Sequence, residues 1–139
     1  MTEHGLDLSD DFTGRPGTAF VVGGSGGLGA AVVRKLAARG SDVAFTYRQN
    51  EASAAQLAQT VSDLGRQAWT IGLDLRNHDG CAQAIDAIAE AAGGIHTLVY
   101  AAGPHVPQKH LSKVTPAEMQ EQLDADASGF FAVASPALP

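Results

Sequence analysis

A glycine-rich segment between a short apolar run and a helical pattern constrains the fold of this chain most. Residues 23–29 read Gly-Gly-Ser-Gly-Gly-Leu-Gly. They follow Thr18–Val22, an apolar run ending in two β-branched residues, which is typical of a buried parallel strand. A helical pattern then extends from Leu28 to Arg39, and Gly40 is placed to end it. The side of this helix that we expect to be buried carries Leu28, Val32, Val33 and Leu36.

The same order of strand and helix continues along the chain. The sequence predicts further strands at 42–47, 68–73 and 97–100, and further helices at 51–64 and 78–92. Gly65 and the pair Gly93-Gly94 are stop signals for these two helices. Thr115, Pro116 and Glu118 predict a capping box at the start of one more helix.

Strands that alternate with helices of this length predict an α/β fold with a parallel sheet. Right-handed crossovers favour a Rossmann-type doubly wound three-layer αβα sandwich with strand order 3-2-1-4. The chain would hold an incomplete form of this fold, as a partial nucleotide-binding domain over residues 18–139. Residues 1–17 are interpreted as a polar leader ending in a turn at Gly14–Gly17.

Composition and charge exclude several classes of protein. The formal net charge is −6 and no basic stripe is present, which argues against a nucleic-acid partner. No apolar run approaches the roughly 18 residues of a membrane span, and Met1–Asp11 is too polar for a signal peptide. The single cysteine, Cys81, fits a cytoplasmic location and is interpreted as a packed thiol. We expect no metal site.

The glycine segment has the context of a phosphate-binding loop, because it links a strand to a helix. Gly23 would turn the chain sharply, Gly27 would let the backbone approach a pyrophosphate, and Gly29 would let the helix pack closely. The phosphates would lie at the positive end of the helix. The alternative is a tight loop that binds nothing.

The spacing Gly-x-x-x-Gly-x-Gly resembles that of the short-chain dehydrogenase/reductase family, with Val22 where the family usually has Thr. Asp74 follows the third strand, as in the family, and Tyr100-Ala101-Ala102-Gly103 stands where the family usually shows Asn-Asn-Ala-Gly. The resemblance extends over Gly14–Pro139 but covers only the front half of the family's domain. It implies cofactor contacts at Gly23, Ser25, Gly26, Gly27, Leu28, Gly29, Tyr47, Arg48, Asp74, Leu75, Ala101, Ala102 and Gly103.

The end of the second strand indicates which nicotinamide cofactor is preferred. An acidic residue there would accept hydrogen bonds from the adenosine ribose and would repel a 2′-phosphate. This chain has Tyr47-Arg48 instead, and Arg48 is a permanent cation with donors suited to phosphate. We therefore favour NADP(H) over NAD(H). The alternative is that Arg48 is a solvated loop residue.

The resemblance implies reduction of carbonyls or oxidation of alcohols by hydride transfer, with a Ser, a Tyr and a Lys four residues after the Tyr. Here Tyr47 and Tyr100 are followed at that distance by Glu51 and Pro104, so the catalytic Ser/Tyr/Lys set is expected to be absent from this chain. Asp126 falls where the family places a catalytic Asn. Four further polar residues are interpreted as ordinary loop or helix positions: His105, His110, Asp79 and Glu90.

Three hypotheses remain open at this point. The chain is the front of an NADP(H)-dependent oxidoreductase acting on a small carbonyl or alcohol substrate, such as the 3-oxoacyl-carrier-protein reductase group. Alternatively, it is an inactive dinucleotide-binding module or a truncated remnant without function. In each case the last strand would present an open edge, so we expect a homo-oligomer or a complementing carboxy-terminal half as partner.

Overall fold

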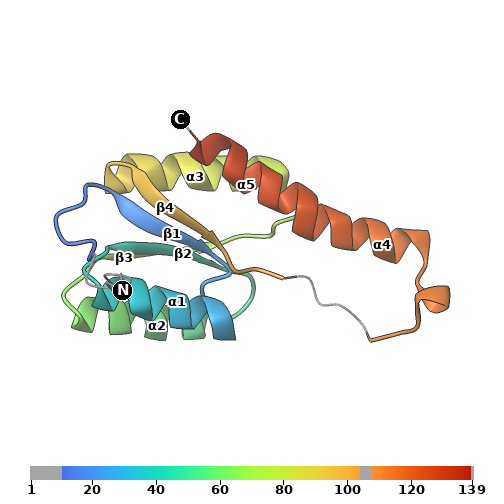
Figure 1. Cartoon of the computed structure of the whole chain (residues 1–139), viewed down its shortest axis with the longest axis horizontal. Helices are drawn as coiled ribbons and strands as arrows, with labels where there is room; N and C mark the ends of the chain where they lie inside the picture. Colours follow the sequence, from blue (N-terminus) through green and yellow to red (C-terminus); the bar gives the residue numbers. More distant parts are fainter. Residues whose placement is uncertain (1–10, 104–107, 139) are drawn as a thin grey trace, which may run out of the picture.

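The computed structural model describes residues 11–103 and 108–138, and it contains one parallel sheet between two layers of helices (Figure 1). The strands are β1 (Thr18–Val22), β2 (Val43–Tyr47), β3 (Ala68–Gly72) and β4 (Ile95–Tyr100). Their order in the sheet is β3-β2-β1-β4 and every pair is parallel. The predicted α/β sandwich with strand order 3-2-1-4 is therefore confirmed.

The helices cover both faces of the sheet. They are α1 (Gly27–Ala38), α2 (Glu51–Asp63), α3 (His78–Ala92), α4 (Pro116–Leu123) and α5 (Gly129–Ala137). A 3-10 turn, Leu111–Lys113, precedes α4, and a π-helical segment, Asp124–Ser128, joins α4 to α5. Helices α1 and α2 lie on one face of the sheet, and α3 and α5 lie on the other (Figure 1).

The central strand β1 supplies the core on both faces, because successive side chains of a strand point in opposite directions. Val21 packs in one buried cluster with residues of α1 and α2, such as Val33 and Val61. Phe20 and Val22 pack in the other cluster with residues of α3 and α5. Every residue of β1 is buried, as expected for an interior parallel strand.

Local sequence signals fix the helix ends, some of them predicted above and some not. Asn50 and Asn77 cap α2 and α3 with their side chains. Gly93 ends α3 in the left-handed conformation, with φ of 74°. Thr115 and Glu118 form the predicted capping box at α4. These caps satisfy backbone groups that a helix terminus would otherwise leave without partners.

One packing prediction is wrong. Leu28, expected on the buried side of α1, is 73% exposed, and the buried residues of this helix are Gly29, Val33 and Ala37. The helix is rotated by about one residue from the expected orientation, because Gly29 must face the preceding loop. Val32 and Leu36 are partly buried at the edge of the core.

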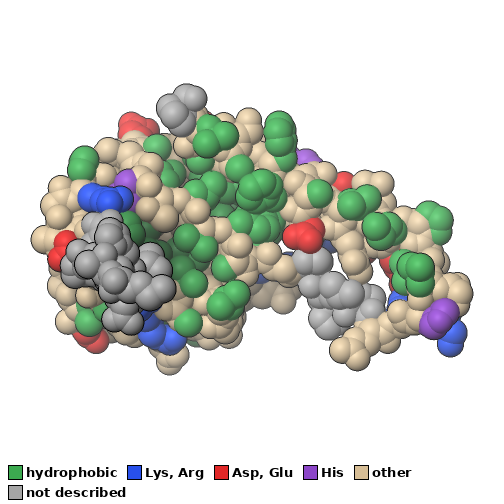
Figure 2. Space-filling view, viewed as in Figure 1, with side chains coloured by type: hydrophobic (Ala, Val, Ile, Leu, Met, Phe, Trp, Pro, Cys, Tyr) green, Lys and Arg blue, Asp and Glu red, His purple; other side chains and the backbone are tan. Residues whose placement is uncertain are grey.

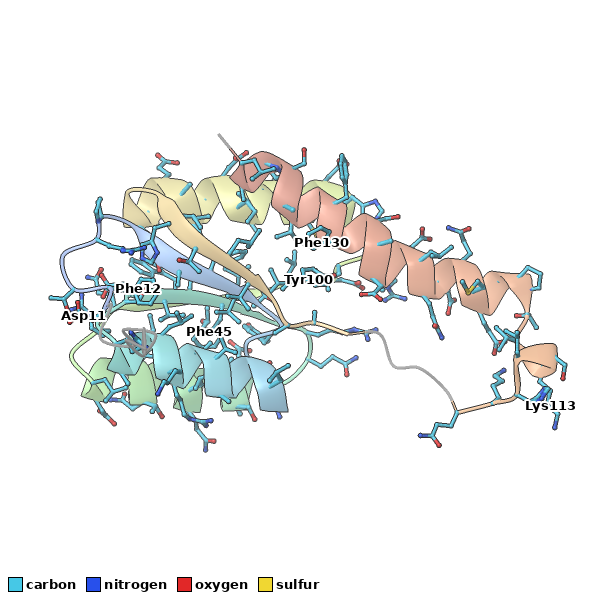
Figure 3. All side chains as sticks on the ribbon, viewed as in Figure 1. Asp11, Phe12, Phe45, Tyr100, Lys113 and Phe130 are labelled. Carbon is cyan, nitrogen blue, oxygen red and sulfur yellow. The ribbon has the colours of Figure 1, made fainter. Side chains whose placement is uncertain are left out.

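Residues 11–17 of the predicted leader pack on the domain. The backbone N–H of Phe12 donates to the Arg39 carbonyl at 2.7 Å, and its ring stacks on His96 with centroids 5.3 Å apart. Figure 3 shows Asp11 and Phe12 beside the sheet. The rest of the predicted leader, residues 1–10, lies outside the described residues, so the boundary at residue 18 stays a prediction.

Strand β4 is an open edge within the described residues, as expected. It pairs only with β1, and all six of its residues are partly exposed. Hydrophobic side chains gather on the surface over β4 and α5 (Figure 2). The exposed apolar residues of α5 and its end include Phe130, Phe131 and Leu138.

Among residues 11–103 and 108–138, no helix has the length and apolar character needed to cross a membrane. Within the same ranges, no group of three or more His, Cys, Asp or Glu side chains is arranged to hold a metal ion. Cys81 is buried, as expected for a packed thiol, and burial raises the pKa of this thiol.

Candidate functional site

A cavity of about 600 Å³ opens at the carboxyl ends of the strands. It lies where the strand order reverses between β1 and β4, which is the position at which doubly wound sheets bind ligands. Its lining comes from the segments that follow β1, β2, β3 and β4 and from the helix after β4: Gly23, Ser25, Gly26, Thr46, Tyr47, Arg48, Leu73, Asp74, Leu75, Arg76, Ala101, Ala102, Gly103, Glu118, Glu121, Gln122 and Ala125.

Gly23 and Gly29 are two of the positions in the glycine loop that have no space for a side chain. Gly23 has φ of +79°, and a Cβ there would lie 2.7 Å from Ala102 Cα. A Cβ at Gly29 would lie 2.0 Å from the carbonyl oxygen of Gly23, so α1 can pack against the loop only with glycine at this position. Gly27, by contrast, has open space beside it.

The start of α1 leaves backbone donors beside the cavity. Gly26 is the N-cap residue, and no side-chain hydrogen bond caps this helix within the described part of the chain. The N–H groups of the first turn carry the positive end of the helix dipole. This terminus can therefore hold an anion such as a phosphate group.

A hydroxyl from the neighbouring strand anchors the loop. Thr46, at the end of β2 and 3% exposed, accepts a hydrogen bond from the N–H of Gly23 at 2.8 Å. Val22, which replaces the family's Thr, is fully buried in the core. The sequence analysis missed Thr46 because only the strand pairing brings it beside the loop.

The segment after β4, Ala101–Gly103, lies beside the glycine loop. The N–H of Ala101 donates to the Val22 carbonyl at 2.8 Å, which extends the pairing of β1 and β4 by one residue. Ala101, Ala102 and Gly103 then line the cavity with little side-chain volume. A flat ligand can therefore approach the backbone closely here.

Charged groups surround the part of the cavity after β2 and β3. Arg48 is exposed on the cavity wall. Asp74 forms an ion pair with Arg76, whose Nη2 lies 2.7 Å from Asp74 Oδ2. The side-chain hydrogen bonds of Arg76 lower the pKa of Asp74 to about 2, and the charge of Arg48 contributes to the shift. Arg76 was also missed, although its position two residues after Asp74 could have suggested the pair.

The far wall of the cavity comes from α4 and the π-helical segment. The Tyr100 hydroxyl donates to the carbonyl of Ala125 at 2.8 Å, and the Tyr100 ring meets Phe130 edge-on with centroids 5.4 Å apart (Figure 3). Burial, and then the charge of Asp126, raise the pKa of Tyr100 to about 12. Tyr100 therefore stays a hydrogen-bond donor and holds the wall in place.

Ten of the thirteen expected cofactor residues therefore line one cavity, and the other three lie next to it. Gly27, Leu28 and Gly29 belong to the first turn of α1 and are not part of the cavity lining. Asp126 is exposed on the π-helical segment, also away from the lining. His105 lies outside the described residues.

Other polar residues singled out in the sequence lie away from the cavity lining. His110 is exposed, and its Nδ1 lies 2.8 Å from the Ser112 hydroxyl. Asp79 and Glu90 are exposed on α3, as expected. These positions therefore agree with their interpretation as ordinary loop and helix residues.

Comparisons with known proteins agree with this geometry. The family profile of short chain dehydrogenases matches residues 17–139. The 3beta-hydroxysteroid dehydrogenase 1 of Eggerthella lenta is 31% identical over 125 residues, which cover 90% of this chain and 47% of that protein. The short-chain dehydrogenase/reductase homolog YusS of Bacillus subtilis is 31% identical over 99 residues, which cover 70% of this chain and 91% of YusS.

Solved structures give the same result. A short chain dehydrogenase from Burkholderia cenocepacia J2315, crystallised in complex with NADP, is 33% identical, with a TM-score of 0.82. The match covers 87% of this chain and 49% of that one. The chain therefore spans about half the length of this protein and of the Eggerthella enzyme.

Proposed function

The chain belongs to the short-chain dehydrogenase family, and we propose that its cavity binds NADP(H) for an oxidoreductase acting on a small carbonyl or alcohol substrate. One observation carries the proposal. A cavity of about 600 Å³ lies at the strand-order reversal and combines a glycine loop, an open helix terminus and an arginine.

The residues of the cavity fit the parts of a dinucleotide. The loop from Gly23 to Gly29 and the start of α1 would hold the pyrophosphate through backbone N–H groups. Arg48 would bind the 2′-phosphate with its fork of donors, with Tyr47 beside it. Asp74 and Leu75 would contact the adenine, and Ala101–Gly103 would admit the nicotinamide half by close backbone approach.

The bound cofactor would supply the hydride, and the residues of this chain would orient it and hold its phosphates. Asp126 is proposed to take the place of the family's Asn, although it is exposed. The open edge of β4 and the apolar surface of α5 support a further chain segment or a second copy as partner. The cytoplasmic location stays a prediction.

Titration with NADPH and NADH tests the proposal directly. We expect the chain to bind NADPH more tightly, because Arg48 pairs with the 2′-phosphate. A charge-assisted pair of this kind is worth about 1.5–3 kcal/mol, so Arg48→Ala should weaken NADPH binding roughly tenfold or more and leave NADH binding nearly unchanged. Arg34→Ala is the matched control, because Arg34 is an exposed cation of α1 away from the cavity lining.

Two results would contradict the proposal in different ways. Equal affinities for NADPH and NADH would reject the preference for NADP(H) and keep the dinucleotide site. A folded chain without affinity for either compound would reject the site itself. Isothermal titration calorimetry measures both affinities, and circular dichroism establishes that each variant is folded.

A second candidate function is dinucleotide binding without chemistry. It is favoured by one sequence observation, since neither Tyr47 nor Tyr100 is followed by a lysine four residues later. Under this alternative the chain binds NADPH but does not oxidise it in the presence of carbonyl compounds. Steady loss of NADPH absorbance that depends on a carbonyl substrate would contradict it.

A further inference from the structure

Residues 11–17 dock at the amino-terminal end of the sheet, the opposite end from the cavity, and the ring of Phe12 makes the contact (Figure 3). This ring stacks on His96 of β4, with centroids 5.3 Å apart and planes 17° apart. The Phe12 N–H donates to the Arg39 carbonyl at 2.7 Å, and the Phe12 carbonyl accepts from the N–H of Arg15 at 3.0 Å. A short turn therefore presents the Phe12 ring to His96, and the aromatic contact of this segment depends on the state of the imidazole.

The hydrogen bonds of His96 fit a neutral imidazole with its proton on Nε2. Nε2 lies 3.4 Å from the Ser41 hydroxyl, whose single hydrogen is donated to the Asp42 carbonyl at 2.6 Å. The Ser41 oxygen is therefore the acceptor, and Nε2–H is the donor. Nδ1 lies 2.9 Å from Thr97 Oγ1 and accepts from that hydroxyl. Both ring nitrogens thus have partners in one neutral tautomer.

A proton added to Nδ1 conflicts with this arrangement in two ways. The new N–H would point at the hydroxyl hydrogen of Thr97, so this hydroxyl would have to turn away. The imidazolium would also share the Phe12 ring with Arg15, whose guanidinium carbon lies 5.1 Å from the ring centroid. A second cation beside the first weakens the stack that holds the segment.

The charges around His96 come from three segments and favour the same neutral form. Burial, and then the charge of Arg15 in the docked segment, lower the pKa of His96 from its ordinary value of 6.5, whereas the charge of Asp42 before β2 raises it. Asp42 is engaged by Arg66 before β3, whose Nε and Nη2 lie 2.9 and 2.8 Å from its Oδ1. Strand β4 itself carries no Asp, Glu, Lys or Arg.

We propose that Phe12 and His96 form a pH-sensitive latch, which holds residues 11–17 on the sheet while His96 is neutral and releases them when His96 binds a proton. The released segment leaves His96 more exposed and removes Arg15 from it, so the released state takes up the proton more readily. Docking is therefore strongest above pH 6.5 and is lost as the pH falls from 6.5 through the lower pKa of the docked state. A pKa one pH unit lower in the docked than in the released state corresponds to tenfold weaker docking in acid.

NMR spectroscopy of the isotope-labelled chain tests both sides of this contact. A titration from about pH 8 to about pH 4 gives the pKa of His96 from its ring Cε1–H signal, and the heteronuclear NOE gives the order of residues 12–15. We expect His96 to titrate below pH 6.5 and residues 12–15 to lose order over the same pH range. In Phe12→Ala these residues should be mobile at every pH, and the pKa of His96 should rise toward 6.5.

Two glutamine variants separate His96 from the other groups that titrate in this range. His96→Gln keeps a donor and an acceptor but carries no charge, so the order of residues 12–15 should no longer depend on pH. His110→Gln is the matched control, because His110 is exposed and lies before the 3-10 turn, at the opposite end of the molecule from residues 11–17 (Figure 1). This variant should keep the pH profile of the wild-type chain.

Each outcome decides for or against the latch. It is rejected if residues 12–15 of the wild-type chain are mobile at pH 8, or if they stay ordered after His96 has taken up its proton. It is also rejected if His96→Gln loses the same order in acid, or if the pKa of His96 is unchanged in folded Phe12→Ala. Loss of order that follows the titration of His96, and that is absent in His96→Gln and retained in His110→Gln, supports it. No nucleotide takes part in these measurements, so the result does not depend on the dinucleotide site.

Discussion

Replacing Thr46 with valine should loosen the glycine loop, because it removes the acceptor of the Gly23 N–H. That hydrogen bond is 2.8 Å long, and valine has nearly the shape of threonine, so packing changes little. A donor left without a partner costs about 1–3 kcal/mol when buried. Gly23 is only partly buried, so we expect a loss of about 1–2 kcal/mol.

For a domain of this size, such a loss lowers the melting temperature by roughly 3–10 °C. Thermal unfolding followed by circular dichroism measures the change, and urea unfolding gives the free energy independently. NADPH affinity should fall as well, since Gly23 begins the proposed phosphate loop. Thr46→Ser keeps the hydroxyl and should retain most of the stability.

The matched control is Thr70→Val on β3, where the threonine side chain is exposed. If Thr46→Val melts at the same temperature as Thr70→Val, the hydrogen bond does not stabilise the loop and the reasoning fails.

Three further predictions concern the loop, the far wall and the helix cap. Gly29→Ala should destabilise the fold by at least 1 kcal/mol, because its Cβ would lie 2.0 Å from the Gly23 carbonyl oxygen; an unchanged urea midpoint would refute this. The pKa of Glu118, lowered from 4.5 to about 2 by Lys109 and the helix cap, predicts stability that is present above pH 4.5 and lost toward pH 2. The loss over this range should be smaller in Glu118→Gln, as urea unfolding at each pH would measure. Tyr100→Phe removes a donor to the π-helical segment and should cost about 1 kcal/mol, with faster amide exchange in residues 124–129; protection equal to wild type would exclude this role.

The order of elements and the sheet topology could be predicted from sequence because local signals and general rules determine them. Asn50 and Thr115 cap helices through residues within three positions, so a short window contains the whole interaction. The strand order 3-2-1-4 follows from right-handed crossovers together with the Rossmann-type winding that the glycine loop after the first strand indicates. Most residues of the cavity were named from the resemblance to a family pattern, and they lie at or shortly after the ends of the strands.

The orientation of α1 could not be predicted from its apolar pattern alone. Leu28, Val32 and Leu36 form one apolar stripe, and Gly29, Val33 and Ala37 form the next. The second stripe is buried because the Gly23 carbonyl leaves no space for a side chain at position 29, so Gly29 must face the loop. A steric requirement at one glycine therefore outweighs the larger apolar area of the leucines.

The far wall of the cavity depends on contacts between distant segments, which leave no local signal. Tyr100 reaches the carbonyl of Ala125 across 25 positions. A Cβ at Gly129 would lie only 3.2 Å from the Tyr100 hydroxyl, so the helix passes close to this side chain. The π-helical turn lies at this contact, and no periodicity in residues 116–137 indicates it.

The loop of this chain illustrates why a family pattern can lose a residue and keep its geometry. The N–H of Gly23 needs an acceptor, and the side chain of Val22, the residue before it on β1, offers none. The strand register pairs Val21 with Phe45, so Thr46 follows on β2 at the level of Val22. Its hydroxyl accepts the same N–H from one strand away. Because backbone groups of the loop would hold the phosphate, a hydroxyl supplied by β2 can anchor the loop although β1 carries valine at its end.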